Sequence, residues 1–198
     1  VLAFGSAFMI SSLLMIWSNI DPIPAYIAFF NGSIGGYVQI ADTLLRSIPF
    51  LLIGVGIAIA NRSGVINVGA EGQYIVGAIT TTATAILFQN MGVNQALAIT
   101  VSLASGALAG ALWASLAGLM KAYFQINEIV VTVIMNWLAY RIMQWLLRGP
   151  LKNPASEMWP MSPPIEYQLP IILPGTRLHA GFIIAIMLAL LSHYMLFK

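Results

Sequence analysis

The chain has 198 residues, of which 60% are hydrophobic and only 7% are charged, and its formal net charge is +2. Soluble domains carry about 25% charged residues, so this composition excludes a water-exposed globular surface and indicates lipid as the solvent. The lack of cysteine excludes disulfides and thiolate metal sites, and the small, scattered positive charge excludes a nucleic-acid surface. We therefore expect an all-α, polytopic transmembrane helical bundle.

About six apolar stretches approach the roughly 20 residues that a helix needs to cross a bilayer core. In chain order, the expected spans are residues 1–17, 43–60, 69–88, 96–120, 129–147 and 178–197. The Pro-, Gly- and Asp-containing segment after the first span is expected to be a loop with a short interfacial helix. Because the chain starts at Val1 and ends at Lys198 directly after an apolar run, we expect a fragment of a longer protein, incomplete at both ends.

Residues 1–198 are expected to form one transmembrane domain, which contains a long Pro-rich extramembrane loop at 149–180. The numbers of Lys and Arg on the two sides do not decide the orientation of the spans. Positive charge is denser in the short loops, which favours a cytoplasmic position for them.

A polar, glycine-rich stretch at 67–73, Asn-Val-Gly-Ala-Glu-Gly-Gln, separates the second and third expected spans, and Glu71 is the only charged residue between Arg62 and Lys121. A carboxylate that faces lipid is costly, so we expect Glu71 to lie within the helix bundle, on a tight connection or a broken helix. Discontinuous helices often build transporter sites, which makes Asn67, Glu71 and Gln73 candidates for a substrate path. The alternative is that Glu71 only holds the turn together, by accepting hydrogen bonds from a helix N-terminus or by pairing with Arg62.

A second polar stripe lies at the start of the fifth expected span. Glu128, Thr132 and Asn136 are four residues apart and share one side of a helix, with Asn127 beside them. This face either lines a substrate path or forms hydrogen bonds to another helix, and the sequence leaves both open.

The fourth expected span carries small residues at four-residue spacing: Ser102, Gly106, Gly110, Ala114 and Gly118. Small residues let helix backbones approach closely inside a membrane. We expect this face to pack against another helix of the same chain.

The remaining motifs do not build a catalytic centre. His179 and His193 lie far apart in the sequence, with no third ligand nearby, so neither indicates a metal site. The sequence contains no metalloprotease motif, nucleophile elbow or phosphate loop. We expect a chain without catalytic residues, metal or cofactor.

Several longer stretches resemble the membrane permease subunit of bacterial ABC importers for nucleosides and simple sugars, within the branched-chain amino acid and sugar permease family. The similarity is carried by INVGAEGQYIVGA from Ile66 and INEIVVTVIMNWLA from Ile126. LLIGVGIAIANRSGVINVGAEGQ, GALAGALWASLAGLMKAYFQINEIVVTVIMNW, RGPLKNP and ILPGTRLHAG follow the family's order, so the resemblance covers nearly the whole chain.

The resemblance implies a translocation subunit of an ATP-driven importer, multi-pass in the bacterial cytoplasmic (inner) membrane. It implies ABC ATPase subunits, a second permease subunit and an extracytoplasmic substrate-binding protein as partners, and places 149–180 outside the cell. Nucleosides are the first expected solutes, because Asn, Thr and aromatic groups suit neutral, flat, hydrogen-bonding molecules. Simple sugars or branched-chain amino acids are the alternative solutes. An un-energised channel or membrane scaffold is the alternative hypothesis from a different functional class.

Overall fold

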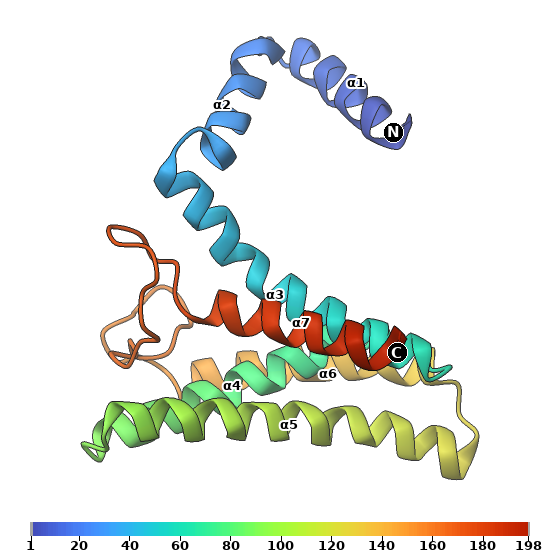
Figure 1. The fold of residues 1–198 in the computed structure, drawn as a ribbon, viewed down its shortest axis with the longest axis vertical. Coiled ribbons are helices and arrows are strands. Elements are labelled where there is room, and N and C mark those ends of the chain that lie inside the picture. Colours follow the sequence, from blue (N-terminus) through green and yellow to red (C-terminus); the bar gives the residue numbers. More distant parts are fainter. Residues whose placement is uncertain (1, 198) are drawn as a thin grey trace. The chain divides into compact units, whose positions relative to one another are not determined.

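The computed structural model describes residues 2–197, which form seven helices (Figure 1). The helices are α1 (Leu2–Trp17), α2 (Pro22–Ile34), α3 (Tyr37–Arg62), α4 (Ala70–Asn90), α5 (Gln95–Phe124), α6 (Glu128–Arg148) and α7 (Gly181–Phe197). The described residues contain no strand, only an isolated antiparallel bridge between Ile171 and His179. The expected all-α fold is therefore confirmed.

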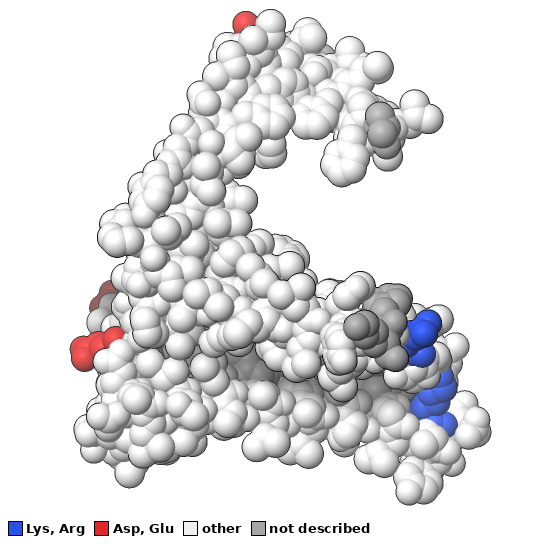
Figure 2. Space-filling model, viewed as in Figure 1, with Lys and Arg blue, Asp and Glu red and all other residues white. Residues whose placement is uncertain are grey.

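Three helices, α3, α5 and α6, are long and apolar enough to cross a membrane by length and composition. The apolar helices α1 and α7 are shorter, with 16 and 17 residues. Helix α4 has 21 residues, and its polar first turn and its run of threonines make it less apolar than its neighbours. These features are those of a partial polytopic helical bundle, and on the face shown in Figure 2 almost all atoms belong to uncharged residues.

The chain divides into two compact units. The first extends to Ile48 and includes Ile171–Phe182, and the second runs from Pro49 to Pro170 and resumes at Ile183. The segment expected to be a loop with a short helix contains α2, which begins after Asp21 because the Asp21 side chain accepts a 2.9 Å hydrogen bond from the Ile23 N–H. Helix α3 then begins at Tyr37, earlier than expected.

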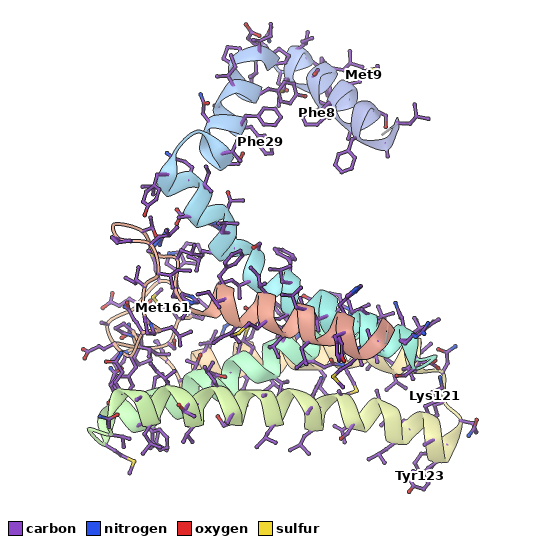
Figure 3. All side chains as sticks on the ribbon, viewed as in Figure 1. Phe8, Met9, Phe29, Lys121, Tyr123 and Met161 are labelled. Carbon is purple, nitrogen blue, oxygen red and sulfur yellow. The ribbon has the colours of Figure 1, made fainter. Side chains whose placement is uncertain are left out.

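In the first unit, α1 and α2 are joined through the side chain of Tyr26. Its hydroxyl lies 2.6 Å from the Ser11 hydroxyl and donates to the Phe8 carbonyl oxygen at 2.8 Å. The Phe8 and Tyr26 rings meet edge to face, with centroids 5.2 Å apart, and Figure 3 labels Phe8 on α1. Elsewhere in this unit, the Arg177 guanidinium lies 3.5 Å from the Asp42 carboxylate.

The second unit is built on the close approach of α4 and α5. A Cβ atom added to Gly106 would lie 1.9 Å from Thr81 Oγ1 and 2.7 Å from the Gly77 carbonyl oxygen. A Cβ atom on Gly110 would lie 3.1 Å from the Gln73 carbonyl oxygen. The two backbones can approach this closely only because glycine has no side chain.

The last residue of the small-residue stripe, Gly118, does not take part in the contact between α4 and α5. Gly118 is exposed, and no described atom outside its chain neighbours and its own helix backbone lies within 4 Å of a Cβ atom built on it, so its assignment to the packing face is wrong for this chain. Four residues turn a helix by about 400°, so each step of the stripe drifts by about 40° and Gly118 lies roughly 160° around the helix from Ser102. The buried side continues through Ala117 instead.

The Pro-rich segment after α6 is irregular and is held to the turn between α4 and α5. The Gln89 side chain donates to the Pro164 carbonyl oxygen and accepts from the Glu166 N–H, and the Tyr167 hydroxyl donates to the Val93 carbonyl oxygen at 2.6 Å. The Gln95 side chain donates to the carbonyl oxygen of Gln168 at 2.9 Å. Hydrogen bonds between side chains and backbone therefore attach the Pro-rich segment to the end of α4, the start of α5 and the turn between them.

The close contact at Gly106 generates a matched pair of substitutions. Alanine is favoured over glycine in a helix by about 1 kcal/mol, so Gly118→Ala is expected to keep or raise the melting temperature of the purified protein in detergent. Gly106→Ala is expected to lower it, by about 1–3 kcal/mol of unfolding free energy, because its methyl group overlaps Thr81 and Gly77. Equal melting temperatures for the two variants would show that α4 and α5 are not in tight contact at Gly106.

Candidate functional site

The first turn of α4 lies well inside the length of its neighbour α6. After α3 ends at Arg62, residues 63–69 are not helical, and α4 begins at Ala70. The Gly72 N–H then donates to Asn136 Oδ1 at 2.8 Å. Asn136 lies about 12 Å along α6 from its first residue, Glu128, at 1.5 Å per residue. The segment 63–69 is therefore irregular backbone that reaches a helix start part-way along α6.

The side chain of Asn136, which belongs to α6, caps the N-terminus of α4. Gly69 stands at the N-cap of α4 and has no side chain with which to accept a hydrogen bond, so the first N–H groups need another partner. The Asn136 amide accepts from the Gly72 N–H and also donates to the Val68 carbonyl oxygen at 3.0 Å. One amide therefore satisfies a donor in α4 and an acceptor in the segment before it.

Two glycines let α6 come this close. A Cβ atom on Gly69 would lie 2.8 Å from Thr132 Cβ, and one on Gly72 would lie 2.8 Å from Asn136 Oδ1 and 3.1 Å from Asn136 Cα. Any larger residue at either position would push α6 away from the start of α4.

Asn67 and Gln73 are brought together and pair with each other. Asn67 Oδ1 accepts from the Gly69 N–H at 2.9 Å and from Gln73 Nε2 at 3.2 Å, and Asn67 Nδ2 donates to Gln73 Oε1 at 3.3 Å. Their polar groups hold the irregular segment against the first turn of α4.

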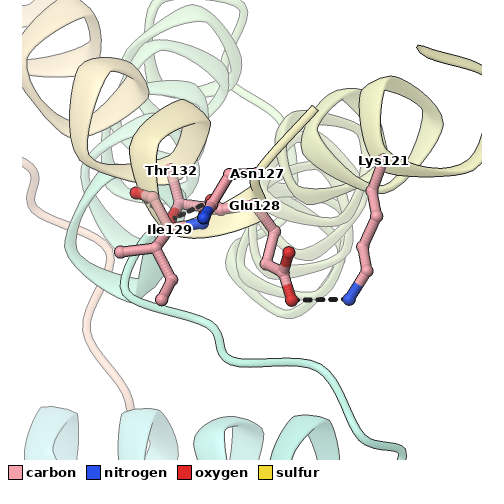
Figure 4. A network of polar contacts seen from close by, with 5 residues as sticks. All are labelled: Lys121, Asn127, Glu128, Ile129 and Thr132. Atoms are coloured by element: carbon pink, nitrogen blue, oxygen red, sulfur yellow. Dashed lines mark hydrogen bonds and ion pairs between the residues drawn. The ribbon is translucent and has the colours of Figure 1, made fainter. Parts of the chain in front are cut away.

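The polar residues at the start of α6 have local partners (Figure 4). The Asn127 side chain caps α6 by accepting from the Ile129 N–H at 2.9 Å, and the buried Thr132 hydroxyl donates to the Glu128 carbonyl oxygen at 2.7 Å. The Glu128 carboxylate pairs with the Lys121 ammonium group of α5 at 2.5 Å. The Lys121–Glu128 pair joins α5 to α6 across their connecting turn, and Figure 3 labels Lys121 and Tyr123 at the end of α5.

Glu71 does not lie within the bundle, and the expectation of burial is wrong. Its side chain is exposed, whereas the adjacent Gly72 is buried against α6. Neighbouring residues of a helix point about 100° apart, so the contact between Gly72 and Asn136 turns Glu71 away. The carboxylate sits in the first turn of α4, where the partial positive charge of the helix end stabilises an anion.

Trp113 of α5 belongs to this cluster and was not among the candidates. A Cβ atom on Gly72 would lie 3.2 Å from Trp113 Nε1. The indole ring packs against a cluster formed by Ala117, Val131 and Met135. Its N–H group is buried and has no hydrogen-bond partner among the described residues. Helical spacing is the sequence signal that could have identified Trp113. On α5, position 113 lies closer to the face formed by Gly106 and Gly110 than position 114 does.

Comparison with known proteins identifies related chains. Residues 39–198 match the family described as branched-chain amino acid transport system / permease component. The guanosine ABC transporter permease protein NupP of Bacillus subtilis is 27% identical over 190 residues, which is 94% of this chain and 54% of that protein. The glucose ABC transporter permease protein TsgB13 of Haloferax volcanii is 27% identical over 153 residues, 77% of this chain and 40% of that protein.

A third relative is the nucleoside ABC transporter permease protein NupB of Lactococcus lactis, 25% identical over 138 residues, 70% of this chain and 37% of that protein. The chain thus spans about half the length, or less, of these curated relatives. No solved structure matches the chain.

The capping role of Asn136 predicts a loss of stability when its amide is removed. Asn136→Leu keeps a similar volume but leaves the Gly72 N–H and the Val68 carbonyl oxygen unpaired, so the free energy of unfolding should fall by about 1–3 kcal/mol. Faster amide hydrogen exchange at 68–73 should accompany this loss. The control is Gln144→Leu on the same helix, which removes only an exposed hydrogen bond to Tyr140. If both substitutions lowered the free energy of unfolding equally, Asn136 would not be the cap of α4.

Proposed function

This chain belongs to the branched-chain amino acid transport system permease family, and on that premise we propose that it is the transmembrane translocation subunit of an ATP-driven importer. The match over residues 39–198 carries the proposal. The relatives described above all bear names of ABC transporter permeases, and three helices of this chain are long and apolar enough to cross a membrane.

Nucleosides are the proposed solutes. Two of the three relatives carry nucleoside or guanosine in their names, and the third carries glucose, so simple sugars are the second candidate. The buried and half-buried groups around the start of α4 are amides, an indole and backbone N–H and C=O groups, whereas the Glu71 carboxylate of the same turn is exposed. Such groups suit neutral molecules with several hydrogen-bonding atoms better than they suit ions.

The proposed path runs past the start of α4. A helix that begins inside the protein, after a segment of irregular backbone, is a feature from which transporters build solute sites. Among the path candidates, Glu71 is exposed, whereas Asn67, Gln73, Thr132 and Asn136 form hydrogen bonds within the protein. We assign to these four residues a structural role: their hydrogen bonds hold together the helices that line the proposed path.

The remaining assignments follow from the proposed activity. The chain would work in the cytoplasmic (inner) membrane with a second permease subunit, ABC ATPase subunits and an extracytoplasmic substrate-binding protein. ATP hydrolysis would take place in the ATPase, so this subunit needs no cofactor or catalytic residue. The irregular segment 149–180 would lie on the extracytoplasmic side, where the binding protein delivers the solute.

The test is uptake by the complete importer in liposomes. ATP-driven accumulation of radiolabelled guanosine, suppressed by excess adenosine or uridine but not by glucose, is the expected result. An ATPase variant that cannot hydrolyse ATP serves as the control and should abolish accumulation. Uptake of glucose in place of nucleosides would select the sugar alternative, and equal uptake with the inactive ATPase would show an un-energised channel.

A further inference from the structure

Trp113 is packed at the level of the α4 start. Its ring packs against Ala117 on its own helix and against Val131 and Met135 on α6. Its Nε1 atom is directed to Gly72, whose position would bring a Cβ atom within 3.2 Å of that nitrogen. Turning the N–H group toward another partner would disturb this packing between α5 and α6.

Around Gly72, the side-chain amides of Asn67, Gln73 and Asn136 have hydrogen-bond partners, whereas the buried indole N–H has none among the described residues. The Asn136 amide bonds the Gly72 N–H and the Val68 carbonyl oxygen, and the side chains of Asn67 and Gln73 bond each other. Within residues 2–197, Trp113 Nε1 is left without a hydrogen-bond partner. Buried donors in folded proteins are rarely left unpaired, because their desolvation is not offset.

From this accounting we infer that the indole N–H of Trp113 is a hydrogen-bond donor to an oxygen atom of the transported solute. The inference rests on the proposed function and deepens it, because it names a group that binds the solute. Nucleosides and sugars both present carbonyl, hydroxyl or ring oxygens as acceptors.

The solute reaches this group when the first turn of α4 moves away from α5 and α6. Gly72 has no side chain, so a small displacement of the backbone uncovers Trp113 Nε1. The same displacement breaks the hydrogen bond from the Gly72 N–H to Asn136 Oδ1. One movement therefore exposes two N–H donors and the Asn136 amide together, which forms a binding site for a neutral, oxygen-rich molecule in the open state.

A second buried polar atom without a partner in the described chain, Ser102 Oγ, does not belong to this site. It lies on α5 about 16 Å from Trp113 at 1.5 Å per residue, on a residue that is 2% exposed.

The experiment removes the N–H group and keeps the shape of the ring. Trp113 is replaced by benzothienylalanine, in which sulfur stands in place of the indole N–H, in the complete importer in liposomes. Initial rates of ATP-driven uptake are measured for guanosine, its 2′-, 3′- and 5′-deoxy analogues and 2-aminopurine riboside, which lacks the base carbonyl oxygen; deoxyglucoses replace them if glucose is the solute. The same replacement at Trp137, which is 65% exposed on α6, is the control.

The replacement is expected to slow uptake roughly 3- to 10-fold, the effect of losing one hydrogen bond. The analogue that lacks the contacted oxygen should be transported equally by both proteins, since no bond remains to be lost. The melting temperature of the solute-free protein should not fall. Equal slowing for every compound, no slowing at all, or a lower melting temperature would each overturn the inference. Failure of the unmodified importer to accumulate any of these solutes would instead refute the proposed function.

Discussion

The start of α4 depends on an amide that comes from another helix. Gly69 cannot cap α4, and the unpaired N–H groups of a helix start are expensive away from water. Asn136 of α6 supplies the acceptor and bonds the preceding carbonyl group as well. This requirement places α6 beside the first turn of α4, and it explains why glycines stand at 69 and 72, where a side chain would collide with α6.

The contact between α4 and α5 follows the same physical logic. Lipid is as apolar as a leucine side chain, so burying apolar surface between two helices in a membrane gains little, and close backbone packing and interhelical hydrogen bonds must supply the attraction. Gly77 and Gly106 provide the close approach, and the hydroxyls of Thr84 and Ser105 lie 3.1 Å apart across the same interface. Trp113 completes the arrangement by packing between α5 and α6 beside Gly72.

The polar residues of this region hold the protein together in the state described. Asn67 and Gln73 pair with each other, Asn127 caps α6, and Glu128 pairs with Lys121. A transporter must exchange such bonds for bonds to its solute as it moves, because a polar group buried without a partner is costly in every state. The bond between Gly72 and Asn136 joins the helix start to its neighbour, and under the proposed function it is the bond that is exchanged when the site opens.

Much of this protein could be predicted from local sequence. Composition predicts the membrane helices, and the polar stretch at 67–73 predicts an interruption between them, because both depend on the residues of the segment itself. The directions of Glu71, Trp113 and Gly118 depend on helix phase: a four-residue spacing drifts by about 40° at each step. Which side of α4 meets α6 is set by the partner of the Gly72 N–H, a residue 64 positions away in the sequence. That pairing appears only in the folded chain, because it forms between groups that no local pattern brings together.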